Sequence, residues 1–186
     1  MTARCEWATG NDLMAEYHDT EWGVPSHDDN HLLEMLILEG SQAGLSWQTI
    51  LNKREGYRRA FANFDLATIS AYGESDVERL VQDAGIVRHR GKIQATIGNA
   101  ITTMAVQAEF GSLDAYLWGL AGDEPVRNSP ETIDDVQATT EVSISMSKAL
   151  KKRGFRFVGP TTVYAFMQSA GMVNDHLVTC FRYDEV

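Results

Sequence analysis

The spacing of apolar residues limits the possible folds of this chain more than any other feature. Apolar residues recur at steps of three and four from Lys92 to Ala108 and from Trp47 to Phe61, and a shorter stretch at 113–120 shows the same spacing. This period is typical of helices that bury one face. No segment alternates apolar and polar residues for long enough to predict a strand. The fold class is therefore expected to be all-α.

Several residues predict where individual helices begin and end. Ser75, followed three residues later by Glu78, has the pattern of a capping box. Gly85 stands where this helix is expected to end in a left-handed residue. Asp28 and Asp29 precede another helical segment and are predicted to cap its start.

The segment that follows these aspartates, LLEMLILEG at residues 32–40, is apolar on almost every side. A helix of this kind is buried all round. Glu39 lies in its last turn, where a carboxylate has three possible settings. It reaches solvent at a cleft, it is held by specific partners, or it lies on the surface after the helix ends. This stretch alone does not choose among them.

The length and composition indicate one folded domain spanning residues 1–186. A chain of 186 residues is long enough to bury a core, and 44% hydrophobic with 23% charged residues is typical of a globular protein. No apolar run is long enough to cross a membrane, and the first residues lack the pattern of a signal peptide. Two cysteines do not predict a disulfide framework. The expected location is the cytoplasm.

The net charge of −10 argues at first against a nucleic-acid partner, because phosphate binding depends on lysine and arginine. The basic residues are not spread evenly, however. They gather at 88–92 and at 148–156, whereas acidic residues gather elsewhere. This pattern fits either a local basic face on an acidic protein or two solvated helix ends.

The second basic segment continues into a predicted hairpin between two helices, at about residues 154–162. Gly154 breaks the first helix, Gly159 follows, and Pro160 is well placed in the first turn of the next helix. Thr161 and Thr162 place hydroxyl groups beside the free N–H groups of that helix start. Glycine lets the backbone approach a phosphate, and helix N-termini bind anions. The alternative is a plain corner between two helices.

Four residues from the two ends of the chain form a possible metal site. His176 and Cys180 are four residues apart, which is one turn if their segment is helical, and Cys5 and His18 lie near the other end. Two cysteines and two histidines suit tetrahedral zinc, and a full set of four leaves no position for water. Such a zinc would be structural and would join the two ends of the chain. The alternative is two buried cysteines and two ordinary histidines.

Several longer blocks of the sequence resemble those of a known protein family. They are RCEW, YHDTEWGVP, LLEMLILEGSQAGLSW, LVQDAGIVRHRGKIQATIGNA and KALKKRGFRFVGPTTVYAFMQSAGMVNDH, followed by Cys180. They run in order over nearly the whole chain, and only the stretch 109–143 has nothing distinctive. The blocks are similar to those of DNA-3-methyladenine glycosylase I, a family within the helix-hairpin-helix DNA glycosylases.

This resemblance implies a helix-hairpin-helix glycosylase fold in which the hairpin at 154–162 grips DNA. It also implies a structural zinc ion that joins the N- and C-terminal segments. The zinc ligands would be Cys5, His18, His176 and Cys180. The residues in contact with DNA would be Gly44, Leu45, Gly159, Thr161 and Thr162. Of these, Leu45 would fill the gap that a flipped base leaves in the duplex.

The same resemblance implies a base-binding pocket. Glu39 would act as a catalytic or base-reading carboxylate, and Tyr17 and Trp47 would hold the base. Members of the family often have a second pocket tyrosine where this chain has Met14, so Met14 would line the pocket without offering a hydroxyl group. 3-Methyladenine in DNA is positively charged, and an indole face such as that of Trp47 attracts a cationic ring.

The implied function is excision of 3-methyladenine from alkylated double-stranded DNA by hydrolysis of the N-glycosidic bond, which starts base excision repair. The products would be free 3-methyladenine and an abasic site. Related enzymes that also cut the backbone carry a lysine after the hairpin glycine, and Thr161 holds that place here, so no lyase step is expected. Most of the superfamily has a catalytic aspartate at the position that matches Asn174. The protein is expected to act as a monomer without a membrane partner.

Three alternatives stay open at this level. The four metal-binding residues would hold a catalytic zinc in a metal-dependent hydrolase. A DNA-binding module without activity would use the hairpin, with Tyr17, Glu39 and Trp47 merely in its core. A glycosylase with a different substrate is favoured by Met14.

Overall fold

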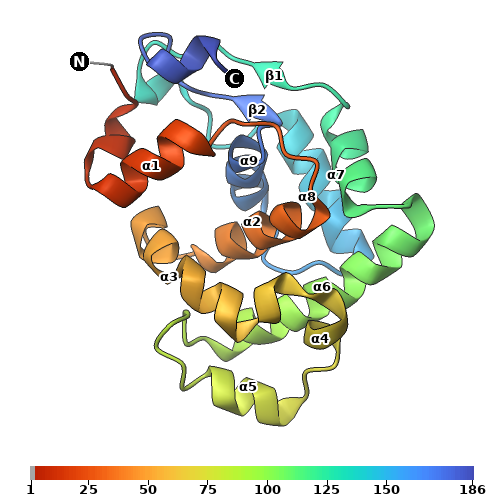
Figure 1. Ribbon diagram of the computed structural model, residues 1–186. Helices are drawn as coiled ribbons and strands as arrows, with labels where there is room; N and C mark the ends of the chain where they lie inside the picture. Colours follow the sequence, from red (N-terminus) through yellow and green to blue (C-terminus); the bar gives the residue numbers. More distant parts are fainter. Residues whose placement is uncertain (1–2) are drawn as a thin grey trace.

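The helix that is apolar on almost every side lies at the centre of the structure (Figure 1). The computed structural model describes residues 3–186. In it the central helix α2 (Asp29–Ser41) packs against α3 (Trp47–Ala60), α6 (Arg90–Phe110), α7 (Leu113–Ala121) and α9 (Pro160–Ser169). Every residue from Leu32 to Ser41 is buried, because apolar side chains cover the whole circumference of the helix. The predicted burial is confirmed.

The rest of the described chain is also mostly helical, and the predicted all-α class is confirmed. The other α-helices are α1 (Asp12–Thr20), α4 (Leu66–Ser70), α5 (Glu74–Leu80) and α8 (Glu141–Arg153). Short 3-10 turns are η1 (Glu6–Thr9), η2 (Ala62–Phe64), η3 (Ile133–Asp135) and η4 (Phe181–Asp184). Strands in residues 3–186 are limited to β1 (Val126–Arg127) and β2 (Val173–Asn174), which pair in parallel. No helix in this part of the chain is long and apolar enough to cross a membrane.

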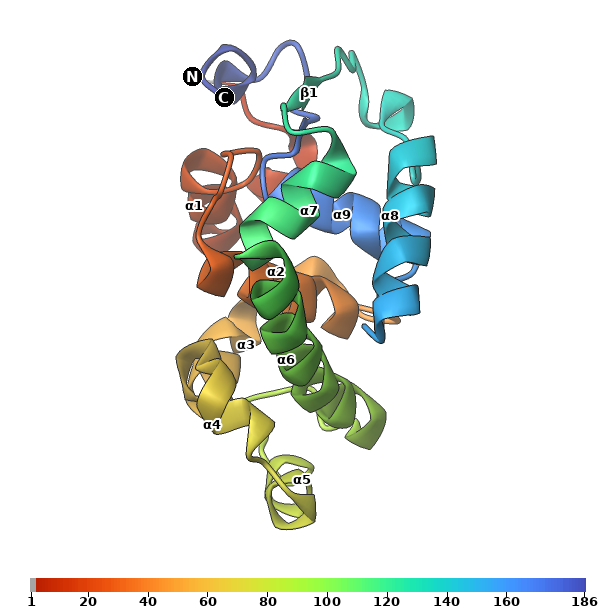
Figure 2. The ribbon, with the colours of Figure 1, turned by 90° about the vertical axis from the view of Figure 1, so that its right-hand side faces the viewer.

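Figure 2 shows the long helix α6 running from the end of the molecule that contains α4 and α5 toward α7 and α8. The predicted helices at 92–108, 47–61 and 113–120 correspond to α6, α3 and α7. The stretch 128–143 is irregular apart from η3 and the first turn of α8. Helical periodicity therefore located the long helices well.

The two aspartates at the start of α2 cap two different helices. Asp28 accepts a hydrogen bond from the backbone N–H of His31 at 2.7 Å, so it caps α2 as predicted. The carboxylate of Asp29 instead accepts the backbone N–H groups of Leu113 and Asp114, at 2.9 and 2.8 Å. The prediction that Asp29 caps α2 is therefore wrong, because this side chain caps the first turn of α7.

The predicted ends of α5 are also corrected. The helix begins one residue before Ser75, and Gly73 is its N-cap residue, whose N–H donates to Asp76 at 3.0 Å. The helix ends well before Gly85, which therefore does not form its left-handed end. Gly85 instead meets Gly56 of α3, where an added Cβ would lie 2.0 Å from the Gly85 carbonyl oxygen. This close approach of two backbones requires glycine at position 56.

A turn joins α8 to α9 where the hairpin was predicted. Gly154 follows α8 with a φ of 107°, a left-handed conformation that favours glycine. Gly159 is the N-cap residue of α9, and Pro160 occupies its first turn. The hydroxyl group of Ser147 in α8 donates to the carbonyl oxygen of Val158 at 2.6 Å, which ties the turn to the preceding helix.

The two ends of the described chain lie side by side (Figure 1). The N–H of Phe181 donates to the carbonyl oxygen of Ala3 at 3.0 Å. The segment that carries His176 and Cys180 is not helical, since it leaves β2 and enters a turn closed by the Cys180 N–H and the Leu177 carbonyl oxygen at 2.7 Å. The helical turn considered for these two residues is therefore wrong, although the turn also brings them together.

Candidate functional site

A cavity of about 290 Å³ lies where α1, α2 and α9 meet the chain ends and the start of α3. The four predicted pocket residues Met14, Tyr17, Glu39 and Trp47 all line it. The full lining consists of Cys5, Glu6, Trp7, Met14, Tyr17, Trp22, Glu39, Gln42, Trp47, Ile133, Val136, Ala165, Gln168, Asp175 and Leu177. Tyr17, Glu39 and Trp47 are thus pocket residues and not only part of the core.

Glu39 is a buried carboxyl group in this cavity. Glu39 lies in the last turn of the apolar helix α2, and only 6% of its surface is exposed. Burial raises the pKa of Glu39 to about 8, and the Ser169 hydroxyl group offsets this only in part. An isolated carboxylate is costly to bury without a partner, so the empty cavity favours the neutral form. A positively charged ligand would favour the carboxylate.

Tyr17 and Trp47 each place an unpaired polar group in the same region. The Tyr17 hydroxyl oxygen and the Trp47 indole Nε1 are buried and have no hydrogen-bond partner among residues 3–186. The two ring centroids lie 5.4 Å apart, with the ring planes inclined by 49°. Burial raises the pKa of Tyr17 well above its usual value, so its hydroxyl group keeps its proton. Buried polar groups in native proteins nearly always have partners, which indicates that a ligand supplies them here.

Two further tryptophans line the cavity, and the sequence analysis gave neither a role. The rings of Trp7 and Trp22 meet edge to face with centroids 5.0 Å apart. Trp7 also lies 6.4 Å from the ring of Tyr17. In the sequence, these tryptophans are marked only by their positions near Cys5 and His18, two of the predicted metal ligands. The cavity is therefore aromatic on two sides.

Asp175 is a second buried carboxylate in the cavity that the sequence analysis missed. It accepts hydrogen bonds at 2.7 Å from Tyr164, Gln168 and Asn128. It is 3% exposed, and the three donors come from α9 and from the segment after β1. The neighbouring Asn174 does not line the cavity, because its side-chain amide donates to backbone carbonyl groups of the C-terminal segment.

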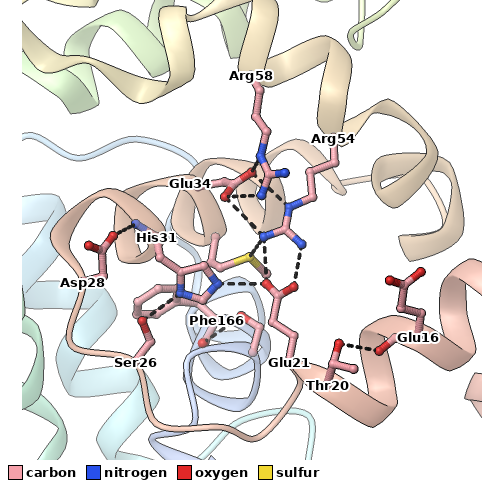
Figure 3. Close-up of polar contacts among 12 residues, drawn as sticks. Glu16, Thr20, Glu21, Ser26, Asp28, His31, Glu34, Arg54, Arg58 and Phe166 are labelled. Atoms are coloured by element: carbon pink, nitrogen blue, oxygen red, sulfur yellow. Dashed lines mark hydrogen bonds and ion pairs between the residues drawn. The ribbon is translucent and has the colours of Figure 1, made fainter.

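A network of ion pairs joins the segment after α1 to α2 and α3 (Figure 3). Arg54 donates to both oxygens of Glu21 at 2.7 Å and to Glu34 at 3.0 Å, and Arg58 donates to Glu34 at 2.7 Å. Although burial opposes the shift, His31 and Arg54 lower the pKa of Glu21 to about 2. Since Glu21 directly follows α1, the network holds the end of the helix that carries the pocket tyrosine.

The four predicted metal ligands form one buried cluster. One ligand atom of each of Cys5, His18, His176 and Cys180 lies within 4.8 Å of the other three. Cys180 Sγ lies 3.4 Å from His18 Nε2, and both sulfur atoms lie 3.7 Å from His176 Nδ1. The edges of a tetrahedron with metal–ligand bonds of about 2.0–2.3 Å measure about 3.3–3.8 Å. Three of the six separations are therefore those of a tetrahedral site, and the residue types suit a metal ion.

The second nitrogen of each histidine ring in the cluster has its own partner. His18 Nδ1 lies 2.8 Å from a carboxylate oxygen of Asp19, and His176 Nε2 lies 3.0 Å from the carbonyl oxygen of Trp22. Because each of these nitrogens donates its N–H to an oxygen acceptor, His18 Nε2 and His176 Nδ1 carry no proton. Their lone pairs face the cysteines. Burial lowers the pKa of His18, and it lowers that of His176 to about 4, so both rings are neutral at pH 7.

The cluster of Cys5, His18, His176 and Cys180 shares a wall with the cavity. Cys5 and Leu177 line the cavity, and the ring of Trp22 lies 4.6 Å from that of His176. The four ligands are all buried. A fully ligated, buried site of this kind supports a structural ion more than a catalytic one, because no coordination position is open to water.

The residues predicted to contact DNA lie outside the cavity. Gly44 and Leu45 are exposed in the turn between α2 and α3, where Gly44 has a φ of 79° and Leu45 is 40% exposed. Gly159, Thr161 and Thr162 lie at the start of α9. One turn further along α9, Ala165 and then Gln168 line the cavity. The same helix therefore leads from the hairpin to the cavity.

Part of each basic segment is paired within the protein. Arg90 forms ion pairs with Glu74 and Glu78, and Arg153 pairs with Glu109. The other basic side chains of the two segments, apart from Lys92, are exposed and form no ion pair within residues 3–186. They are Arg88, Lys148, Lys151, Lys152 and Arg156. Because Phe157 of the hairpin lies 6.3 Å from His89, the two basic segments meet at the hairpin, as a local basic face requires.

The raised pKa of Glu39 predicts a dependence of stability on pH. In the folded protein the carboxyl group keeps its proton up to about pH 8, whereas in the unfolded chain it releases the proton near its ordinary value of 4.5. Between these values the folded state holds more protons, so the free energy of unfolding falls as pH rises, by at most about 1.4 kcal/mol per pH unit. Glu39→Gln removes this contribution.

Urea unfolding of both proteins between about pH 5 and pH 8 measures the effect. We expect the stability of Glu39→Gln relative to wild type to increase steadily over this range. A difference that stays constant with pH would show that Glu39 ionises normally in the folded protein.

Comparison with known proteins gives consistent matches over nearly the whole chain. The model of the methyladenine glycosylase family matches residues 7–183. The chain is 50% identical over 180 residues to DNA-3-methyladenine glycosylase 1 of Escherichia coli, covering 97% of this chain and 96% of that protein. It is 44% identical over 180 residues to DNA-3-methyladenine glycosylase of Haemophilus influenzae, covering 97% of each.

Solved structures give the same result. A crystal structure of 3-methyladenine DNA glycosylase I superposes with a TM-score of 0.94 at 49% identity, covering 96% of this chain and 98% of that one. A structure that describes 3-methyladenine recognition by the Staphylococcus aureus enzyme superposes with a TM-score of 0.92 at 34% identity, covering 96% and 95%. The chain belongs to the methyladenine glycosylase family.

Proposed function

We propose that this protein is a DNA-3-methyladenine glycosylase that excises the methylated base from double-stranded DNA. Relatives at 50% and 44% identity carry this name, and a related structure contains 3-methyladenine. The observation that carries the proposal is the group of unpaired polar atoms on Tyr17 and Trp47 beside the buried Glu39. A base that enters the cavity would supply their missing partners.

The cavity suits a positively charged purine better than a neutral one. The face of Trp47 attracts a cationic ring, which contributes about 0.5–2 kcal/mol depending on desolvation. Glu39 accepts hydrogen bonds from the base, and the positive charge of the base brings the pKa of this carboxyl group down. Tyr17 contacts the edge of the base. Met14 lines the cavity without a hydroxyl group, so it contributes only apolar contact.

The reaction is hydrolysis of the N-glycosidic bond. Water attacks C1′ of the sugar, the bond from C1′ to the base breaks, and its electron pair leaves with the base. The water loses one proton to solvent, which leaves a hydroxyl group on C1′. Because the methylated base is a cation in DNA, it departs neutral, so little acid catalysis is needed. Glu39 either polarises the water or reads the base. Thr161 offers no amine, so the products are free 3-methyladenine and an abasic site in an uncut strand.

DNA is held from two sides of the cavity. The N–H groups of Thr161 and Thr162 precede the first intrahelical hydrogen bond of α9, which runs from Val163 to Gly159, and so are free for a phosphate. Leu45, raised on the turn at Gly44, enters the duplex where the base has left it. Extrusion of the base costs a few kcal/mol, less for a damaged pair.

The metal-binding cluster holds a structural zinc ion. Two thiolates and two neutral imidazoles are the ligands that zinc prefers, and their spacing supports a tetrahedral site. Zinc supplies no chemistry to the reaction in this proposal. The ion instead stabilises the wall of the cavity that Cys5, Trp22 and Leu177 form. The cytoplasmic location, the monomeric state and the start of base excision repair stay predictions.

Base release from methylated duplex DNA tests the proposed function. The wild-type protein should release 3-methyladenine and leave abasic sites without strand cleavage. Glu39→Gln should lower kcat/KM about 10- to 100-fold, since a hydrogen bond to a charged group contributes about 1.5–3 kcal/mol. Chromatography of the released bases measures both results.

The matched control is Glu16→Gln, the same change at an exposed glutamate of α1, and it should behave as wild type. Equal rates for Glu39→Gln and wild type would show that the role given to Glu39 is wrong. A protein that binds abasic or alkylated duplex but releases no base would be a DNA-binding module without this activity.

Cobalt(II) substitution tests the metal site and its structural role. The protein should bind one ion per chain and show the visible absorption bands of a tetrahedral site with two sulfur and two nitrogen ligands. These bands should persist when 3-methyladenine is added, because no ligand position is open. Cys180→Ser should lose the ion and lower the unfolding temperature by about 2–4 °C for each kcal/mol lost.

Bands that change to those of a five-coordinate ion on addition of the base would contradict a structural role. A Glu39→Gln protein serves as the control, since it should bind the same amount of metal as wild type.

A further inference from the structure

A buried lysine holds the turn between α2 and α3. Lys92 of α6 is 8% exposed, and its ammonium group donates to the carbonyl oxygens of Ser41 at 2.8 Å and Ala43 at 2.9 Å. These carbonyl groups lie at the C-terminal end of α2, where the helix dipole favours a positive charge. Two residues further on, Leu45 projects into solvent. The turn at 42–46 thus depends on a side chain from a distant part of the sequence.

Burial of this ammonium group destabilises the folded protein, because the charge loses its contact with water. Lysine is almost never buried without a paired charge, and burial lowers the pKa of Lys92. No carboxylate within residues 3–186 forms an ion pair with it. A neutral side chain would stabilise an ordinary core position better. The cost therefore indicates that the two carbonyl contacts serve a purpose beyond core packing.

Asn99, two turns further along α6, makes an equivalent contact with the hairpin. Its side-chain amide donates to the carbonyl oxygen of Arg156 at 3.1 Å and its oxygen accepts the Arg156 N–H at 2.8 Å. Residues seven apart lie on the same face of a helix, so Lys92 and Asn99 project from one side of α6. One helix face therefore holds both the turn at 42–46 and the hairpin.

The end of α2 and the hairpin also touch directly. A Cβ added to Gly40 would lie 3.0 Å from the carbonyl oxygen of Phe157, so no larger side chain fits without movement. Phe157 has a φ of 57°, a conformation that non-glycine residues rarely adopt. Such strain persists where the surroundings impose it. The turn, the hairpin and the end of α2, with Glu39 one residue before Gly40, form one packed unit.

We propose that Lys92 is a positioning residue that holds the turn at 42–46 at a set distance from the hairpin. The turn then enters the duplex at the nucleotide whose backbone the hairpin holds. Asn99 has the matching role on the hairpin side. This inference rests on the proposed function in so far as the turn and the hairpin contact DNA.

Lys92→Met tests the inference because it keeps the side-chain stem and removes the ammonium group. We expect kcat/KM for release of 3-methyladenine from duplex DNA to fall about 10- to 100-fold, as for other losses of alignment remote from the chemistry. The affinity for a duplex that contains a tetrahydrofuran abasic analogue should fall as well. The affinity for free 3-methyladenine should fall much less than the affinity for this duplex, because Lys92 does not line the cavity and most of the lining residues lie outside the turn at 42–46.

Val106→Ala is the matched control. Val106 is buried in the second half of α6, about 21 Å along the helix from Lys92. This variant should therefore lower the unfolding temperature without altering the ratio of DNA to free-base binding. Asn99→Leu is a second test, should Lys92→Met fail to fold. It should reduce binding to the abasic duplex and leave free-base binding unchanged.

Equal losses of free-base and DNA affinity in Lys92→Met would overturn the inference, since they would mean that the residue supports the cavity as a whole. No loss in either assay would overturn it as well. If the wild-type protein releases no 3-methyladenine, the proposed function fails, but binding to the abasic duplex still tests the role of Lys92.

Discussion

The site depends on the burial of one carboxyl group at the end of an apolar helix. A glutamate in this setting destabilises the ligand-free protein, because burial raises its pKa to about 8 and no cationic side chain within residues 3–186 forms an ion pair with it. The same burial makes Glu39 effective toward a cation, since electrostatic attraction is strong where water is excluded. The burial of Glu39 therefore lowers the stability of the ligand-free protein and increases its selectivity for a charged base.

The surrounding structure keeps this cavity open. Rigid aromatic rings form two of its sides, and the Trp22 carbonyl oxygen lies 3.0 Å from the ring nitrogen Nε2 of His176 in the Cys/His cluster. On the other side, ion pairs of Arg54 anchor the helix that carries Tyr17. Glu21 and Trp22 are neighbours in sequence, so the ion-pair network and the Cys/His cluster fix adjacent residues of the segment after α1. Both sets of contacts keep polar groups in place without filling the space that a ligand needs.

Helical periodicity was enough to predict the long helices and the burial of α2, because these depend on local spacing. The pocket residues came from resemblance to a family, whereas the set of two cysteines and two histidines was also suggested by its residue types, and the structure brings each group together. Predictions failed where a side chain acts on a distant segment. Asp29 caps α7, and Gly85 meets Gly56 across the fold. Asp175 was missed for the same reason, since its three donors lie in two separate segments.

The selectivity of the cavity for free bases is the most direct test of its central property. Isothermal titration calorimetry of the wild-type protein with 3-methyladenine and with adenine compares two purines that differ in one methyl group and in basicity. A cavity built around a buried carboxyl group should bind the more basic 3-methyladenine at least about tenfold more tightly, which corresponds to about 1.4 kcal/mol. Equal dissociation constants for the two bases would contradict this account.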